Sequence, residues 1–284
     1  MRSDPECLVC ILKQSLNTAR IITSDINLLR TIIDQTAEQI LRSDLALTPA
    51  ALSKPVYEIV AGVTGTKDPF RELKHRTNLE ALQLLPELEA NIADADDPLS
   101  IALHLAVAGN IIDLGIGHDF DLINDIKAIL NTEFAVDDTE DFRRDLQPGR
   151  QLLFLGDNSG EIVFDRILVQ ELVGRGLAVT YCVKSGPIIN DATMEDALQA
   201  GLTEMVPVIE TGSNDIGVDF NRISSEFEAA FNRADIIIAK GQGNFETCDD
   251  ASGNIYFLLK AKCDVVAREL GVTTGDIVFT HSPA

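Results

Sequence analysis

Residues 152–165, LLFLGDNSGEIVFD, decide the fold. Four apolar residues come first, a polar turn over residues 156–161 follows, and an apolar run with helical character completes the stretch. This order predicts a buried strand, a tight turn at its carboxyl end, and a helix. Such turns often hold phosphate with glycines and a lysine, whereas this turn carries Asp157, Asn158 and Glu161.

The chain changes character near residue 148. Residues 1–147 are rich in helix-start signals, in which a capping Asp or Thr is followed by Pro. These pairs stand at residues 4–5, 48–49, 68–69 and 97–98. Pro86 lies inside another helical pattern and is expected to break or kink that helix.

Beyond Pro148-Gly149, candidate strands alternate with candidate helices. The strands are expected at residues 151–155, 177–183, 204–209, 235–239 and 255–260, and the helices at 161–174, 191–200 and 220–233. Alternation of this kind predicts a parallel sheet covered on both faces. We therefore expect an α/β protein in which an all-α domain, residues 1–147, precedes a doubly wound domain, residues 148–284.

The composition limits the partners of this chain. Its 284 residues include 45 acidic and 23 basic side chains, which give a net charge of −22. Nucleic acids and anionic membranes attract basic surfaces, so neither partner is expected. The N-terminal sequence lacks the apolar core of a signal peptide, which predicts a cytoplasmic protein. A small anionic substrate would need a metal ion or a few lysines to reverse the local field.

The five cysteines are an odd number, and a disulfide framework is not expected. Cys7 and Cys10 have C-x-x-C spacing, but no second Cys or His pair completes a zinc site. A structural role is favoured for them, and metal and redox roles stay open.

Ligands of open parallel sheets bind beyond the carboxyl ends of the strands. Three polar segments follow predicted strands, at residues 156–161, 184–191 and 240–246. The oxygens of Asp157, Asn158 and Asp191 would suit Mg²⁺ or Mn²⁺. These segments are the best candidates for one site.

Other features of the same segments fit an anion. Lys240 would offer a positive charge to a phosphate oxygen, and the helix that opens at Glu161 would favour a negative ligand. Simpler interpretations stay open, because Asp157 and Asp191 have the context of helix caps, Glu161 that of a helix-start acid, and Lys240 that of a strand end.

Three motifs together resemble one known family: GDNSGEIVFD at residues 156–165, GPIINDAT at 186–193 and AKGQGNFET at 239–247. It was once called domain of unknown function 89, and its members are now described as damage-control, metal-dependent phosphatases. The segments CLVCILKQ, DPFRELKHRTN and VAGNIIDLG are similar to its shorter archaeal-type branch. The resemblance implies a helical region that covers the cleft of a three-layer α/β/α, Rossmann-like domain.

The resemblance also implies roles for single residues. Asp157, Asn158 and Asp191 are the implied metal ligands. The implied phosphate-contacting loop contains Lys240, Gly241, Asn244 and Glu246. The residues of the helical region that would close the cleft are Lys74, Asn78, Asn110 and Asp113. For Asn110 and Asp113 a polar helix end is an equal alternative.

The expected function is metal-dependent hydrolysis of small phosphorylated metabolites, such as sugar phosphates, phosphopantetheine-type compounds or damaged nucleotide and cofactor phosphates. Mg²⁺ or Mn²⁺ is expected, with Co²⁺ or Ni²⁺ as alternatives, and Asp157, Glu161 and Lys240 are the expected catalytic residues. The nucleophile, water or Asp157, stays open. The alternatives are an S-adenosylmethionine-dependent carboxyl methyltransferase, although the turn lacks G-x-G, and a non-catalytic phosphometabolite sensor.

Overall fold

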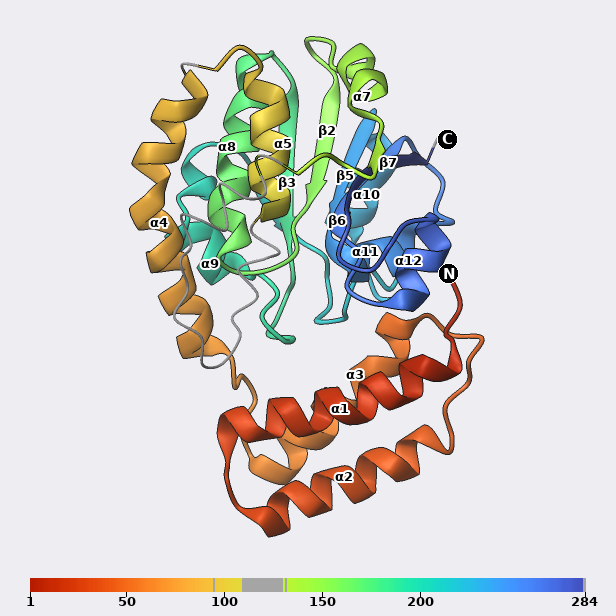
Figure 1. Ribbon diagram of the computed structural model, residues 1–284. Helices are drawn as coiled ribbons and strands as arrows, with labels where there is room; N and C mark the ends of the chain where they lie inside the picture. The colour runs from red at the N-terminus through yellow and green to blue at the C-terminus, as the bar shows by residue number, and fades with distance from the viewer. Residues whose placement is uncertain (94, 109–129, 131, 283–284) are drawn as a thin grey trace.

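The computed structural model describes residues 1–93, 95–108, 130 and 132–282. Its amino-terminal part consists of helices, and Figure 1 shows that the first three lie together beside one end of the sheet. These helices are α1 (Pro5–Ile22), α2 (Ile26–Ile40), α3 (Pro49–Thr64), α4 (Arg71–Ala93) and α5 (Pro98–Ala108).

Most of the predicted Asp-Pro and Thr-Pro signals begin helices where expected. Asp4 and Thr48 are N-caps whose side chains accept hydrogen bonds from backbone N–H groups of α1 and α3. Helix α5 begins at Pro98. The pair at residues 68–69 is the exception: Asp68 forms a turn with the N–H of Phe70, and α4 begins only after it.

A seven-stranded sheet forms the centre of the molecule, in the order β1-β7-β6-β5-β2-β3-β4. All neighbouring strands are parallel except β6 and β7. The strands are β1 (Val136–Asp137), β2 (Gln151–Leu155), β3 (Ala178–Val183), β4 (Val208–Glu210), β5 (Ile236–Lys240), β6 (Ile255–Lys260) and β7 (Ile277–Ser282). The predicted α/β class with a mostly parallel sheet is confirmed.

Helices cover both faces of this sheet, because alternate strand residues point to opposite sides. In β2, Leu152 and Phe154 enter the core beneath α8, whereas Leu153 and Leu155 enter the core on the other face. The helices of this half are α7 (Thr139–Asp145), α8 (Glu161–Gly174), α9 (Met194–Gln199), α10 (Ser225–Arg233), α11 (Gly241–Cys248) and α12 (Asp264–Leu270).

The hydrophobic core extends across the predicted boundary at residues 147–148. Leu85 of α4 and Leu103 of α5 share one buried cluster with Phe164 of α8, and Figure 1 shows α4 and α5 beside α8. Helices α1 to α3 instead bury small clusters of their own, around Ile32 and Val56. The two-domain division stays a prediction, but α4 and α5 pack as part of the α/β layer.

Two other expectations are corrected, and one strand was not predicted. Pro86 does not break α4, because the buried neighbours Leu85 and Leu88 hold the helix against the core on both sides of the missing hydrogen bond; a kink at Pro86 stays a prediction. The segment after Lys240, which the family resemblance implied to be a phosphate-contacting loop, is helix α11. Strand β7 was not predicted, and it lies antiparallel to β6.

Within the part of the chain that the structure describes, no helix combines the length and the apolar composition needed to cross a membrane.

The shared core predicts the effect of a substitution in α5. Leu103 is fully buried, so Leu103→Ala should lower the free energy of unfolding of the α/β half by about 2–5 kcal/mol. Urea denaturation followed by circular dichroism measures this loss. Leu79→Ala on the exposed face of α4 is the control and should change stability by less than about 0.5 kcal/mol. A transition unaffected by Leu103→Ala would contradict the shared core.

Candidate active site

The turn between β2 and α8 is shaped by two close approaches at its glycines. A Cβ on Gly156 would lie 2.4 Å from the Tyr181 hydroxyl oxygen, and a Cβ on Gly160 would lie 2.7 Å from Cγ2 of Thr77. Gly160 also has a φ of 78°, which disfavours other residues. Its N–H donates to the side-chain oxygen of Asn78 in α4 at 2.6 Å.

Main-chain hydrogen bonds join this turn to the loop that follows β3. The N–H of Ala192 donates to the carbonyl of Asp157 at 2.7 Å, and the N–H of Ser159 donates to the carbonyl of Asn190 at 2.8 Å. Asn158 and Asp191 face each other in this antiparallel bridge. The structure therefore brings together the three residues predicted as metal ligands, although Asp191 lies more than thirty positions after Asp157 and Asn158 in the chain.

The amide of Asn158 is oriented by two carboxylates. Its nitrogen donates to Asp157 Oδ2 at 3.0 Å and to Glu161 Oε1 at 2.8 Å. The two amide hydrogens are thereby engaged, which leaves the amide oxygen as the acceptor that Asn158 can offer to a ligand.

The donor set fits a hard divalent cation. It offers the carboxylates of Asp157 and Asp191 and the amide oxygen of Asn158, and oxygen ligands of this kind suit Mg²⁺ and Mn²⁺. In the described ranges no three His, Cys, Asp or Glu side chains are grouped as a metal site. A cation held here would take the amide oxygen of Asn158 as its third donor.

The carboxylates of the site are electrostatically unfavourable in the absence of a cation. Burial raises the pKa of Asp157 well above its ordinary value, and the charges of Glu161 and Asp191 raise it further. Burial also raises the pKa of Asp191 to about 6, although Lys184 and Lys74 oppose the shift. A bound cation would stabilise both carboxylates in their ionised form.

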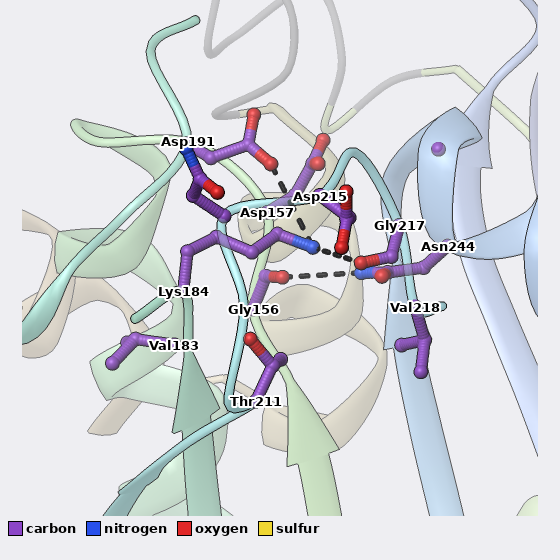
Figure 2. Close-up of polar contacts among 12 residues, drawn as sticks. Gly156, Asp157, Val183, Lys184, Asp191, Thr211, Asp215, Gly217, Val218 and Asn244 are labelled. Carbon is purple, nitrogen blue, oxygen red and sulfur yellow. Dashed lines mark hydrogen bonds and ion pairs between the residues drawn. The ribbon is translucent and has the colours of Figure 1, made fainter. Parts of the chain in front are cut away.

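The cap interpretation of Asp191 is wrong. Thr193 is the N-cap of α9, and its N–H donates to Asp196 at 2.8 Å. Asp191 precedes the helix and pairs with Lys184 at 3.8 Å. Figure 2 shows the Lys184 side chain extending between Asp191 and Gly217, whose carbonyl oxygen accepts a hydrogen bond from its ammonium.

The turn from β5 to α11 comes directly against Asp157. Gly241 has a φ of 77°, and a Cβ at this position would lie 1.9 Å from Asp157 Oδ2. Neither the conformation nor the space admits a side chain. A glycine is thus required at position 241 because two strand-end turns approach each other closely there.

Lys240 is enclosed beneath the turn. Its ammonium donates to Asp165 Oδ1 at 2.7 Å and to Glu161 Oε2 at 3.0 Å, and all three side chains are fully buried. The hydroxyl of Tyr181 donates to Asp165 at 2.7 Å. The two carboxylates raise the pKa of Lys240, whereas burial opposes this shift. Direct contact of Lys240 with phosphate stays a prediction, and it would require the ammonium to leave these partners.

A cavity of about 840 Å³ opens beside the three predicted ligands. This volume is typical of sites for small organic ligands. Its walls come from the strand-end turns, α1 and α3, and from the first residues of α11 and α12. The wall residues include Asp157, Asn158, Asp191, Gly243, Glu246, Lys262, Tyr57, Cys7, Cys10, Cys263 and Arg20.

Comparisons with known proteins agree with this geometry. The model of the damage-control phosphatase ARMT1-like domain matches residues 3–278. The chain belongs to this family. A damage-control phosphatase of Pyrococcus horikoshii is 35% identical over 98% of this chain and 97% of its own length. One of Archaeoglobus fulgidus is 34% identical, with 98% of each chain covered.

The fold of the ARMT1-like family is shared as well. A crystal structure of a DUF89 family protein from Pyrococcus horikoshii superposes with a TM-score of 0.88 at 34% identity, covering 99% of both chains. The end-to-end matches place the chain in the shorter, archaeal-type branch.

Other residues implied by the ARMT1-like resemblance lie around the cavity in different ways. Glu246 is in its wall, where burial raises the pKa of its carboxyl to about 7. Asn244 points away from the ligand space, because its amide donates to the carbonyls of Gly156 and Lys240 (Figure 2). It fixes the two turns relative to each other.

The predicted cleft-closing residues of α4 are buried behind the site. Asn78 donates to Asp196 at 2.9 Å, and Lys74 pairs with Asp196 at 3.2 Å and donates to the carbonyl of Asp191 at 3.4 Å. They clamp the joined turns from behind. Asn110 and Asp113 lie outside the described residues.

Two residues near the site, Lys262 and Asp165, were not predicted from the sequence. Lys262 follows β6, so the strand-end rule applied to this strand would have selected it. Asp165 lies four positions after Glu161 and thus on the same face of α8, which signals a shared partner.

The tight approach at Gly241 predicts a position-specific loss of stability. Gly241→Ala combines unfavourable backbone conformation with a clash against Asp157. Gly271→Ala is the matched control, since Gly271 has a φ of 70° but nothing within 4 Å of the added Cβ. The control should lose about 1–2 kcal/mol in urea denaturation, and Gly241→Ala should lose clearly more. Equal losses of stability in Gly241→Ala and Gly271→Ala would show that the clash with Asp157 costs no free energy of unfolding.

The enclosure of Lys240 predicts a pH-dependent effect. Lys240→Met leaves Glu161 and Asp165 as neighbouring buried carboxylates and should lower the free energy of unfolding by about 3–5 kcal/mol near pH 8. Burial raises the pKa of Asp165 to about 6, so this carboxyl keeps in the folded state a proton that the unfolded state has lost, and stability falls as pH rises above about 4.

The loss caused by Lys240→Met, measured against wild type by urea denaturation, should therefore be smaller at pH 5 than at pH 8. The same loss at both pH values would mean that the ammonium does not neutralise these carboxylates.

Proposed function

We propose that this protein is a metal-dependent phosphatase that hydrolyses phosphomonoesters of small metabolites. The observation that carries the proposal is the main-chain bridge that sets Asp157, Asn158 and Asp191 together in the wall of the cavity. The relatives named damage-control phosphatases support the reaction class.

The substrate class follows from the size and chemistry of the cavity. About 840 Å³ accommodates a sugar phosphate, a phosphopantetheine-type compound or a nucleotide-sized phosphate. The proposed partner is a small phosphorylated metabolite, and with a net charge of −22 the protein is not proposed to bind nucleic acid or membranes. A cytoplasmic location is also proposed.

Three residues of the site would hold the metal ion. Asp157 and Asp191 would hold the metal with the amide oxygen of Asn158. Mg²⁺ or Mn²⁺ is proposed, and Co²⁺ or Ni²⁺ would be accepted by the same donors. When bound, the cation supplies charge neutralisation at a phosphoryl oxygen.

The residues behind the metal ligands act by positioning. Glu161 is fully buried and accepts hydrogen bonds from Asn158 and Lys240. In the proposed site it would hold the Asn158 amide so that the amide oxygen is left for the cation, and its own carboxylate is not in the cavity wall. Asp157 is in the cavity wall, so it is placed either to orient an attacking water or to attack phosphorus itself.

Two other functions use the same fold. A phosphometabolite sensor would bind ligand in this cavity without turnover, and a carboxyl methyltransferase would bind S-adenosylmethionine. No contact within the described residues favours either one. Turnover assays and calorimetry with S-adenosylmethionine separate them from the phosphatase.

Removal of the metal and substitution of Asp191 both test the proposal. Protein stripped with EDTA should lose at least about 90% of its p-nitrophenyl phosphate hydrolysis, and Mn²⁺ or Mg²⁺ should restore it, because the cation neutralises the phosphoryl charge. Asp191→Asn should keep the fold but lose metal-induced thermal stabilisation and most turnover, since a neutral amide is a weaker ligand for a hard dication.

Asp250→Asn is the matched control, because Asp250 is exposed and outside the cavity. It should behave as wild type in both assays. Hydrolysis that is as fast in the stripped protein as in the metal-loaded protein would refute metal dependence.

A further inference from the structure

Ile189 has an unusual backbone conformation beside the predicted metal ligands. Its φ is 45°, and among the residues that the structure describes it is the only one other than glycine with a positive φ. Isoleucine rarely adopts this conformation, because its branched Cβ crowds the neighbouring backbone. The residue lies two positions before Asp191, in the loop that follows β3. The backbone is therefore strained next to a predicted metal ligand.

A tight turn imposes this conformation. The N–H of Asp191 donates to the carbonyl of Ile188 at 3.0 Å, so Ile189 and Asn190 are the two central residues of a β-turn. Where the first central residue has a positive φ, glycine, asparagine or aspartate is usual. The carbonyl of Asn190 also accepts the hydrogen bond from Ser159 that closes the bridge between the two strand-end turns. The turn by itself thus favours glycine at position 189.

The side chain of Ile189 is not part of a hydrophobic core. Within the described part of the chain it belongs to none of the buried apolar clusters. It is only partly buried, whereas its neighbour Ile188 is buried. Burial of an apolar side chain could offset a strained backbone, but for Ile189 this compensation is incomplete. The isoleucine therefore has a cost that folding alone does not explain.

Ile189 contributes instead to the walls of two adjoining cavities. It lines the cavity of about 840 Å³ and a smaller one of about 100 Å³, and Tyr57 of α3 and Phe70 line both as well. We call these three side chains the apolar wall. Burial raises the pKa of the Tyr57 hydroxyl, and the charge of Asp191 raises it further. The apolar wall therefore lies near the predicted metal ligands.

A ligand is the partner that the apolar wall lacks. A phosphate ester whose phosphoryl group is held at Asp157, Asn158 and Asp191 would extend its organic part into the same cavity. Contact between that part and Ile189 would remove apolar surface of both from water, which favours binding. Strained residues of this kind are concentrated at ligand-binding sites, where the surrounding structure holds them in place.

We propose that Ile189 is a specificity-determining residue, which packs against an apolar face or ring in the organic part of the phosphate ester. This inference rests on the proposed phosphatase function and narrows its substrate class to esters with such a face close to the phosphate. Glycine would form the same turn without strain, but it would leave the cavity wall without a side chain at this point. Ile189 acts on the choice of substrate and does not touch the reacting atoms.

The test compares two ligands of the Mn²⁺-loaded full chain by calorimetry. Phenylphosphonate has a ring next to its phosphonyl group and no ester to hydrolyse, whereas inorganic phosphate has no organic part. Wild type should bind phenylphosphonate more tightly than phosphate. Ile189→Gly should weaken phenylphosphonate binding about 5- to 30-fold, because apolar contact with the ring is lost, and should change phosphate binding by less than about twofold.

Two variants control for the size and the place of the substitution. Ile189→Val keeps a branched apolar side chain at the same point and should retain most of the affinity for phenylphosphonate. Ile26→Ala changes an exposed isoleucine of α2 outside both cavities and should leave both affinities unchanged. Phenylphosphonate affinity of Ile189→Gly within about twofold of wild type, or equal weakening of both ligands, would overturn the proposal.

Thermal denaturation and Mn²⁺ affinity separate substrate selection from a structural role. Glycine relieves the strain, so Ile189→Gly without ligand should melt at or above the temperature of wild type. Its Mn²⁺ affinity should stay within about twofold of wild type. A lower melting temperature would show that the side chain stabilises the fold, and weaker Mn²⁺ binding that it positions Asp191; either result overturns the assignment. Wild type that binds phenylphosphonate as expected but hydrolyses no ester would contradict the phosphatase function alone.

Discussion

The candidate site depends on the main-chain bridge between the turn after β2 and the loop after β3. Two short backbone hydrogen bonds, from Ala192 to Asp157 and from Ser159 to Asn190, close this bridge. Since neither bond involves a side chain, the positions of the three oxygen donors are set by the sheet itself. Parallel pairing of β2 with β3 places both turns at the same edge, and Asn78 and Lys74 of α4 hold them from behind.

The buried charges around this bridge follow from one requirement. Burying an ionised carboxylate away from water costs free energy, so each buried charge needs a partner of opposite charge. Lys240 supplies it for Glu161 and Asp165, and Lys184 for Asp191. The lysines most enclosed by the fold therefore serve as partners of buried carboxylates.

Much of this arrangement could be predicted from the sequence. The limits of β2, β6 and α8 match the patterns of apolar residues and glycines, because these elements are buried and regular. The direction in which the Lys240 side chain points was not predicted, although the alternation of side chains along a strand determines it. Every second residue of β5, namely Ile236, Ile238 and Lys240, lies on the face of the sheet beneath α8. Glu161 and Asp165 are four positions apart on α8 and therefore share one face of this helix. Helix α11 was missed because its two glycines meet tertiary demands, the close approach of Asp157 to Gly241 and that of Ile216 to Gly243.

Chemistry and ligand selection are carried by different parts of the chain. The oxygen donors and their buried partners stand on the α/β core, whereas α1 and α3 close the opposite wall of the cavity. The contacts that hold those helices there are polar, such as the amino group of Met1 with Asp249 and Lys54 with Asp215. Because their apolar clusters are separate from the main core, side chains on this wall can change without disturbing the bridge. In the proposed site the helices would therefore select the substrate by its shape, and the strand-end turns would bind its reacting group.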